Sequence, residues 1–170
     1  MFKPAATLVT ALGLIATALP AAANVNVRFV ESAPKDRFEI VNASACALVA
    51  TDVVIDLSGS AAGLIFDTTN TGAGVDVFQP FELVAGADAL ASHSRVTDGD
   101  RQVTLSIRRL APAARIAFTI DVDDTAGPRG ITIAGSEIEG ATVRVTSAGN
   151  SRSARFSSGG EAVVATAPCG

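Results

Sequence analysis

The chain lacks tryptophan and tyrosine altogether, and it has one histidine, one methionine and two cysteines among its 170 residues. Proteins that act on sugars commonly hold the rings against aromatic side chains, so these absences argue against a glycosidase and against a binding module that stacks sugars. Seven of the eight phenylalanines follow residue 23 and are expected to fill the core.

The sequence also lacks the patterns of common catalytic sites. His93 could in principle work with Ser92, Ser94 or Asp98, but no G-x-S-x-G nucleophile elbow occurs. The two cysteines are expected to pair, which leaves no thiol nucleophile. We therefore predict that the protein is not an enzyme and that His93 lies on the surface.

No hydrophobic run has the length of a membrane span. The apolar stretch from Thr7 to Leu19 has about 13 residues, whereas a spanning helix needs roughly 20. It follows the cation Lys3 and precedes Pro20 and a run of alanines, which is the pattern of a cleaved secretory signal peptide. Residues 1–23 are therefore predicted to be a signal peptide, and the protein to be exported to the periplasm or to the medium.

Residues 24–170 are predicted to form a single domain. Loss of the signal peptide removes Lys3 and no acid, so the net charge changes from −4 to −5. A mildly acidic surface argues against nucleic acid and against anionic lipid headgroups as partners. The expected partners are an extracellular protein or a polysaccharide, without insertion into a membrane.

Cys46 and Cys169 both lie in the exported part, where an oxidising compartment lets disulfide bonds persist. We predict that they pair and so fasten the penultimate residue to the body of the domain. In the chain-entropy model a disulfide bond that closes such a long loop stabilises the folded protein by about 4 kcal/mol. The alternatives are two separate thiols or a bond to another chain. A metal site is not expected here, because two distant cysteines lack companion histidines.

Apolar residues recur at every second position over short runs, which are separated by Gly, Pro, Asn and Asp. This is the pattern of β-strands. About nine or ten such runs, without a useful amphipathic helix, predict an all-β fold: an antiparallel β-sandwich of immunoglobulin-like type. A closed barrel is the alternative. Residues 85–100 have the weakest pattern, and we expect a loop there.

The clearest unit spans residues 101–123, where "RQVTLSIRRL" and "RIAFTIDVD" are joined by "APAA". We predict a hairpin in which residue 110 pairs with residue 115. The register then pairs apolar residues on one face: Ile107 with Phe118, Leu105 with Ile120, and Val103 with Val122. Because a slip of one residue would turn one whole set to solvent, the pattern is expected to fix this pairing.

Two segments carry a resemblance to a known family. They are "FEIVNASACALVATDVVIDLSGSAAGLIFD" and "VTLSIRRLAPAARIAFTIDVDDT", and they are similar to secreted proteobacterial proteins of the "aggregation factor core" type, a name taken from sponge cell-adhesion proteoglycans. The resemblance covers residues 36–146. The order of the segments also looks like that of bacterial surface immunoglobulin-like modules. It implies a β-sandwich in an extracellular setting, with a role in adhesion.

Acidic residues gather at the end of the predicted hairpin. With Phe118 and Ile120 turned inward, Asp121 and Asp123 should point outward together, about 7 Å apart. The segment "TDGD" should bring two further acids to the same end. Calcium takes six to eight oxygen ligands from carboxylates and carbonyls. The candidate calcium ligands are Asp98, Asp100, Asp121, Asp123 and Asp124.

The alternative is that these acids are solvated and keep the strand end soluble, with Arg101 opposite them to offset part of the charge. Neither "DGD" nor "DVDDT" has the ligand spacing of an EF-hand loop. The sequence leaves both interpretations open.

Taken together, these features predict a non-catalytic secreted or cell-surface module that mediates adhesion or contact with an extracellular matrix, with calcium as a candidate cofactor. The alternative is a periplasmic accessory or ligand-binding domain that recognises its ligand through loops 68–76 and 85–100. The segment Asn42-Ala43-Ser44 matches a glycosylation sequon, which we expect to be idle in a bacterial protein.

Overall fold

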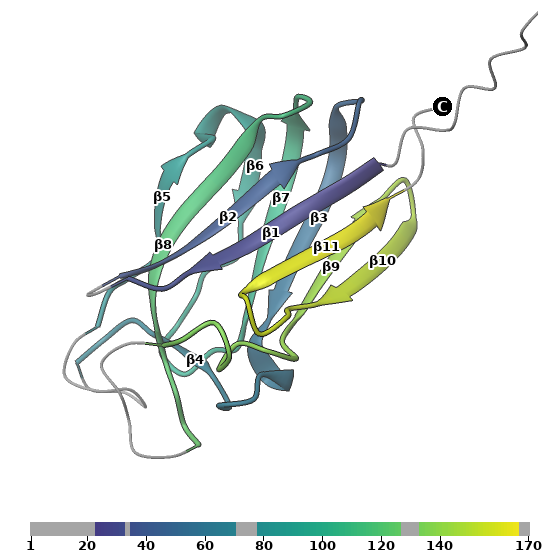
Figure 1. The fold of residues 1–170 in the computed structure, drawn as a ribbon. Helices are drawn as coiled ribbons and strands as arrows, with labels where there is room; N and C mark the ends of the chain where they lie inside the picture. Colours follow the sequence, from purple (N-terminus) through teal and green to yellow (C-terminus); the bar gives the residue numbers. More distant parts are fainter. Residues whose placement is uncertain (1–22, 33–34, 71–77, 127–132, 167–170) are drawn as a thin grey trace, which may run out of the picture.

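A computed structural model describes residues 23–32, 35–70, 78–126 and 133–166. Two antiparallel β-sheets pack face to face, with sheet A in front of sheet B in Figure 1. The predicted antiparallel β-sandwich is confirmed. No helix among the described residues is both long and apolar enough to cross a membrane. The predicted signal peptide lies outside the described residues, apart from Ala23.

Sheet A has six strands and sheet B has five. The order in sheet A is β11 (Glu161–Thr166), β1 (Ala23–Val30), β2 (Asp36–Asn42), β8 (Arg115–Asp123) and β4 (Ile65–Asp67), and β5 (Glu82–Ala85) also pairs with β8. The order in sheet B is β10 (Asn150–Arg155), β9 (Thr142–Ser147), β3 (Leu48–Asp56), β7 (Gln102–Leu110) and β6 (Leu90–His93). Two single-turn 3₁₀ helices, η1 (Leu57–Gly59) and η2 (Ala87–Ala89), are the helical turns of the described chain.

The core lies between the two sheets, and phenylalanine rings fill its centre. Phe38 of β2 is fully buried and stands opposite Phe118 of β8 in the strand register, with ring centroids 5.1 Å apart. Phe29, Phe66 and Phe156 surround Phe38 at centroid distances of 5.1, 6.4 and 6.5 Å. Burial of these rings removes a large apolar area from water, which is the main favourable term in folding.

The predicted hairpin of residues 101–123 is wrong. β7 lies in sheet B and pairs with β3, whereas β8 lies in sheet A and pairs with β2, β4 and β5. The link between them therefore crosses from one sheet to the other, and Ala113 takes a left-handed φ of 60° within it. Alternation identifies the side of each strand that faces the core, but two strands on opposite sides of a core satisfy it as well as two neighbours do.

Asn42, the asparagine of the sequon, holds this link in place. Its side chain is fully buried and its Nδ2 donates to the carbonyl oxygens of Cys46, at 2.8 Å, and Leu110, at 2.9 Å. Its Oδ1 accepts from the backbone N–H and the hydroxyl of Ser44. Its backbone also bonds to Ala113 and Ala114. In the folded protein Asn42 is a structural residue, because its amide is occupied and out of contact with solvent.

We expect the substitution Asn42→Ala to lower the free energy of unfolding by about 2–3 kcal/mol, because it removes the buried amide that donates to the carbonyl of Leu110 and accepts from the backbone N–H of Ser44. Denaturant unfolding followed by far-UV circular dichroism measures this loss. Asn150→Ala is the matched control, since Asn150 is exposed and its amide makes one bond, of 3.3 Å, to Ala148. Equal losses in the two variants would contradict the role assigned to Asn42.

Residues 85–100 are more ordered than expected. They include η2 and β6, which pairs with β7 through Leu90, Ser92 and His93. The weak pattern arises because β6 is a short edge strand, and Leu90 is its one buried residue. Cys46 lies within the described chain and Cys169 outside it, so the disulfide bond between them stays a prediction.

Candidate functional site

Three buried carboxylates converge where β4 meets the end of β8. Asp67 stands directly opposite Asp121 in the strand register, and Asp123 lies two residues further along the same face of β8. One carboxylate oxygen from each residue lies within 4.8 Å of the other two. Their exposed fractions are 0 %, 7 % and 3 %. We call Asp67, Asp121 and Asp123 the acid cluster.

The local sequence explains why these acids share a face. In β8, Phe118, Ile120 and Val122 pack into the core, so the alternate residues must point away from it. In β4, Phe66 does the same and turns Asp67 outward. This part of the prediction for Asp121 and Asp123 agrees with the structure.

The chain that follows β4 helps to enclose the acid cluster. The backbone N–H of Gln79 donates to the carbonyl of Asp67, and the backbone N–H of Asp121 donates to the carbonyl of Gln79. Asp121 and Asp123 are therefore buried although they point away from the core. The alternative that they are solvated acids of a strand end does not hold in this structure.

The segment "TDGD", between β6 and β7, lies against β4. The backbone N–H of Gly99 donates to the carbonyl of Phe66, and the N–H of Phe66 donates to the carbonyl of Asp100. Gly99 has a left-handed φ of 79°, which a residue with a side chain rarely adopts. This turn brings Asp98 beside Asp67, and Asp98 Oδ1 accepts from the backbone N–H of Thr68.

A further acid, Asp36 at the start of β2, lies beside the cluster. It is 3 % exposed, and its two carboxylate oxygens accept from the backbone N–H groups of Ser32 and Val122, each at 3.2 Å. The pKa of Asp36 is raised to about 7, and burial is the largest cause. The charges of Asp121 and Asp123 also raise this pKa, whereas the two backbone hydrogen bonds lower it.

Asp67 is the least compensated carboxylate of the group. Neither of its carboxylate oxygens has a hydrogen-bond donor among the described residues. Its pKa is raised to about 7, with burial as the largest cause, followed by close contact with Asp98 and by the charges of Asp123, Asp98 and Asp121. Two ionised carboxylates cannot hydrogen bond to each other, because neither carries a proton. When ionised, Asp67 is thus buried and unpaired within the described chain.

Asp121 has a similar environment. Burial is the largest cause that raises its pKa to about 7, and the charge of Asp123 is the next. None of the ion pairs between described residues includes Asp67 or Asp121. The site therefore gathers several carboxylates in one buried place.

The structure brings together part of the predicted calcium set. Asp121 and Asp123 meet beside Asp67, and Asp98 lies next to Asp67. Asp100 accepts from the backbone and hydroxyl of Thr97 in its own turn. Asp124 is buried, but it is not one of the three converging carboxylates. The predicted position of Arg101 opposite the acids fails because β7 pairs with β3 and not with β8.

Sequence reasoning missed Asp36 and Asp67. Asp67 ends a short buried strand, and the one signal was an acid directly after "LIF" at the same kind of strand end as Asp121 and Asp123. Only the pairing of β4 with β8 brings these positions together. Asp36 ends the segment "SAPKD", whose residues are typical of turns, and its role depends on the pairing of β2 with β8.

His93 has a structural environment. Its ring stacks on Phe81 with centroids 4.3 Å apart, and Phe81 stacks in turn on Phe118 at 4.7 Å. His93 Nδ1 lies 2.9 Å from the carbonyl oxygen of Ser94. The Ser94 hydroxyl accepts from the backbone N–H of Thr104. His93 thus helps to close the edge between β5 and β6.

The outer side of sheet B carries mainly hydroxyl, amide and charged side chains, and we call it the polar face. Strand registers place its residues in rows that cross four strands. One row holds Ser151, Thr146, Asp52 and Ser106; the next holds Ser153, Arg144, Val54 and Thr104; the third holds Arg155, Thr142, Asp56 and Gln102.

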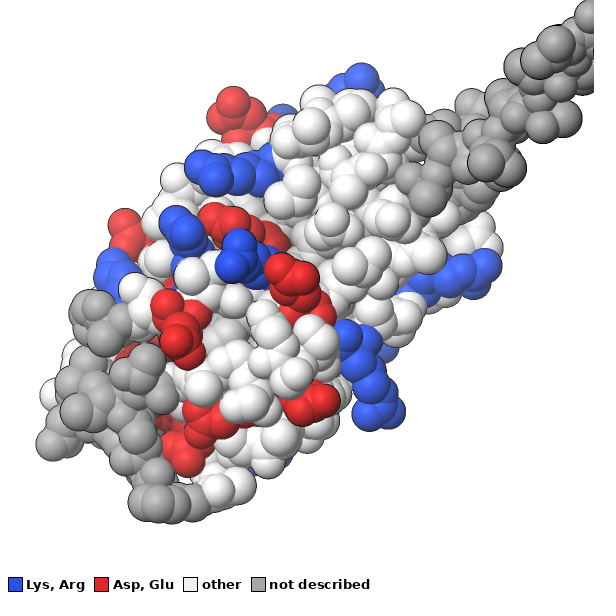
Figure 2. Space-filling view, viewed as in Figure 1, with Lys and Arg blue, Asp and Glu red and all other residues white. Residues whose placement is uncertain are grey.

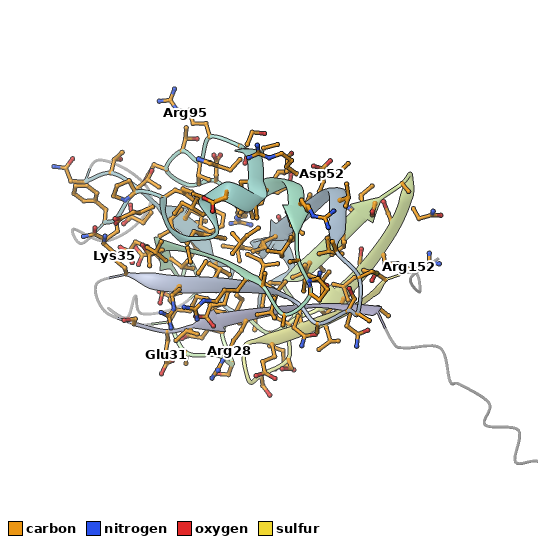
Figure 3. All side chains as sticks on the ribbon, turned by 90° about the horizontal axis from the view of Figure 1, so that it is seen from above. Arg28, Glu31, Lys35, Asp52, Arg95 and Arg152 are labelled. Carbon is orange, nitrogen blue, oxygen red and sulfur yellow. The ribbon has the colours of Figure 1, made fainter. Side chains whose placement is uncertain are left out.

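Neighbouring side chains within these rows bond to each other. The Ser106 hydroxyl donates to Asp52 at 2.7 Å, and the hydroxyls of Thr146 and Ser151 lie 2.7 Å apart. Within these three rows two aspartates, Asp52 and Asp56, balance two arginines, Arg144 and Arg155. Figure 3 shows Asp52 on one side of the sandwich and Arg28, on the outer side of sheet A, on the other.

The outer side of sheet A differs in kind. Acidic and basic side chains are interspersed over it in Figure 2, and several form ion pairs, such as Arg37 with Glu39 at 3.2 Å. A shallow groove of about 270 Å³ between β1, β2 and β11 is lined in part by Arg28, Glu39 and Glu161. Arg28 and Glu161 approach each other to 4.0 Å there.

Comparisons with known proteins identify no family. A scan of protein-family models gives no match, and a search of curated proteins gives no significant match. Among solved structures, a family GH18 chitinase from Chromobacterium violaceum is 13% identical with a TM-score of 0.34; the match covers 79% of this chain and 19% of that one. The carbohydrate-binding module CBM3b from a Clostridium thermocellum cellobiohydrolase is 14% identical with a TM-score of 0.31, covering 78% and 94%. Structural similarity at these TM-scores does not indicate a function.

Proposed function

We propose that this chain is a non-catalytic module of an exported protein, and that it mediates adhesion or matrix contact by binding a neutral polysaccharide on its polar face. The observation that carries the proposal is the set of aligned rows of hydroxyl, carboxylate, amide and guanidinium groups on the outer side of sheet B.

The chemistry of the polar face matches a polymer of hydroxyl groups. Serine and threonine hydroxyls both donate and accept hydrogen bonds, aspartate accepts, and arginine donates in a fixed planar geometry. Because Asp52 and Asp56 balance Arg144 and Arg155, the three rows favour a ligand without net charge. Val54, the apolar residue of the middle row, is 9 % exposed, so the face offers little of the apolar area that anchors most protein partners.

The environment of His93 supports a role without catalysis. Two of the three residues that could have completed a catalytic arrangement with it bond to backbone groups: Ser94 to that of Thr104, and Asp98 to those of Thr68 and Thr69. His93 itself is stacked on Phe81.

Retention on insoluble polysaccharide tests the proposed function. We expect the protein to be retained on cellulose, and the double variant Asp52→Ala/Arg144→Ala to bind at least about 5-fold more weakly, because each lost hydrogen bond is worth about 1 kcal/mol. The matched control is Arg28→Ala/Glu161→Ala, which removes one charge of each sign from the outer side of sheet A. Retention that is equal in both double variants would reject the polar face as the binding surface.

Cell fractionation addresses the alternative function, a periplasmic accessory domain. An adhesion module must reach the cell surface or the medium, so we expect the protein in the outer-membrane or culture fraction. Confinement to the periplasm would favour the accessory domain.

A further inference from the structure

We propose that Asp67, Asp121 and Asp123 bind a calcium ion, and that this ion fastens the chain segments that meet beside β4. The proposal is independent of the polysaccharide ligand: it concerns the opposite sheet and holds whether or not the polar face binds sugar.

The carboxylate of Asp67 is buried without a compensating partner. Its side chain is fully buried and its carboxylate points into the acid cluster, yet neither oxygen accepts a hydrogen bond from a described residue. Burial of an ionised carboxylate destabilises the fold unless a partner compensates the charge. A cation bound between the three carboxylates would supply that partner.

Several carboxylates gather at this site. The acid cluster alone carries three carboxylates, and Asp36 and Asp98 lie beside it. Asp36 accepts from two backbone N–H groups and Asp98 from those of Thr68 and Thr69. Asp67 has no such donor among the described residues, and its carboxylate converges with those of Asp121 and Asp123.

The ligand atoms indicate which metal the site would bind. All the convergent ligands are carboxylate oxygens, which favours a hard cation over zinc or copper. Calcium–oxygen distances of 2.3–2.6 Å let two ligands on opposite sides of the ion lie about 5 Å apart, a span that accommodates oxygens within 4.8 Å of one another. Magnesium requires a smaller and more regular octahedral shell. Water and backbone carbonyls would complete the calcium coordination.

The location suggests what the ion does. Asp67 belongs to a strand of three residues, whereas Asp121 and Asp123 belong to the central strand β8. The turn that contains Asp98 is bound to β4 through backbone hydrogen bonds to Phe66. An ion held by the acid cluster would fix β4, and with it this turn, to the sandwich. In Figure 1 β4 lies at the lower end of the sandwich, beyond the long strands.

Thermal unfolding tests the proposal. Because tryptophan and tyrosine are absent, the melt should be followed by far-UV circular dichroism or calorimetry and not by intrinsic fluorescence. For the protein cleared of metal with EDTA, we expect about 5 mM calcium to raise the unfolding midpoint by roughly 5 °C, given the affinities usual for extracellular calcium modules. The same concentration of magnesium should give a smaller rise.

Two variants make the test specific to the site. Asp67→Asn keeps the shape of the side chain but removes its charge, so we expect a higher midpoint than wild type in EDTA and no rise with calcium. Asp100→Asn, which alters an acid bonded within its own turn, should keep the calcium response of the wild type. Equilibrium dialysis of the folded wild type with calcium alone should find one ion per chain.

Several outcomes would overturn the proposal. They are a wild-type midpoint that calcium does not move, an equal rise with magnesium, a full calcium response in Asp67→Asn, or no bound calcium in dialysis. A midpoint for Asp67→Asn below that of the wild type in EDTA would also count against it, because it would mean that the carboxylate stabilises the metal-free fold.

Discussion

In the presence of EDTA the protein should become less stable as the pH rises from 5 to 8. Asp36, Asp67 and Asp121 have pKa values raised to about 7, against 3.8 for an ordinary aspartate. In each case burial, which disfavours the charged form, is the largest cause. In most proteins stability rises with pH over the acid range, because ionised carboxylates are better stabilised in the folded protein than in the unfolded chain. The direction expected here is the opposite one.

The sign follows from proton binding. Between pH 4 and pH 7 the folded protein holds protons on these carboxyl groups that the unfolded chain has already lost, so stability falls as the pH rises through this range. The stabilisation from each protonated carboxyl group is complete below the pKa that the group has in the unfolded chain. It is lost above the pKa that the group has in the folded protein. A single group shifted in this way contributes at most about 4 kcal/mol, so we expect the midpoint to fall by on the order of 10 °C.

The measurement is a series of calorimetric melts in EDTA at fixed ionic strength. Asp67→Asn should flatten the decline, because it removes one of the coupled carboxylates. Asp88→Asn should leave it unchanged, since Asp88 is an exposed aspartate on η2. A midpoint in EDTA that is constant or rises from pH 5 to pH 8 would show that the buried acids are compensated in another way.

The largest loss of stability should come from Phe38→Ala. Phe38 is fully buried at the centre of the sandwich, with four phenylalanine rings within 6.5 Å of its own. Removal of a buried phenylalanine ring typically costs 3–5 kcal/mol, and we expect about 4 kcal/mol here because four phenylalanine rings would border the cavity.

Denaturant unfolding at a pH where the wild type is stable measures this cost. Val163→Ala is the control, because Val163 is 54 % exposed on β11 and its truncation should change the free energy of unfolding by about 0.5 kcal/mol or less. Phe38→Leu should lie between the two. A loss for Phe38→Ala that is no larger than that for Val163→Ala would contradict the placement of the core.

Much of the fold could be predicted from alternation alone. Val25, Val27 and Phe29 are buried in β1 as their spacing requires, and Phe118 and Ile120 are buried in β8. The partners of each strand could not be predicted in the same way. β7 and β8 follow each other closely and both alternate, yet they lie in different sheets. The alternation within a strand indicates which of its sides faces the core, but it does not indicate which strand is its neighbour in the sheet.

The candidate site shows the same division. The sequence places Asp121 and Asp123 on one face of a strand, because a period of two leaves no other choice once Phe118 and Ile120 are inside. It could not select Asp67 over Asp100 or Asp124, since that choice depends on the register between β4 and β8. It also could not tell buried acids from solvated ones.

The sequence by itself determined an all-β chain, the inward and outward sides of its strands, and a supply of acids at one strand end. The tertiary structure alone decided which strands are neighbours, that Asp67 and Asp36 join the acids, and that these carboxylates are shielded from water. The physical reason is range: alternation arises from the geometry of a single strand, whereas the burial and charge of a carboxylate depend on residues that are distant in sequence and meet only in the folded sandwich.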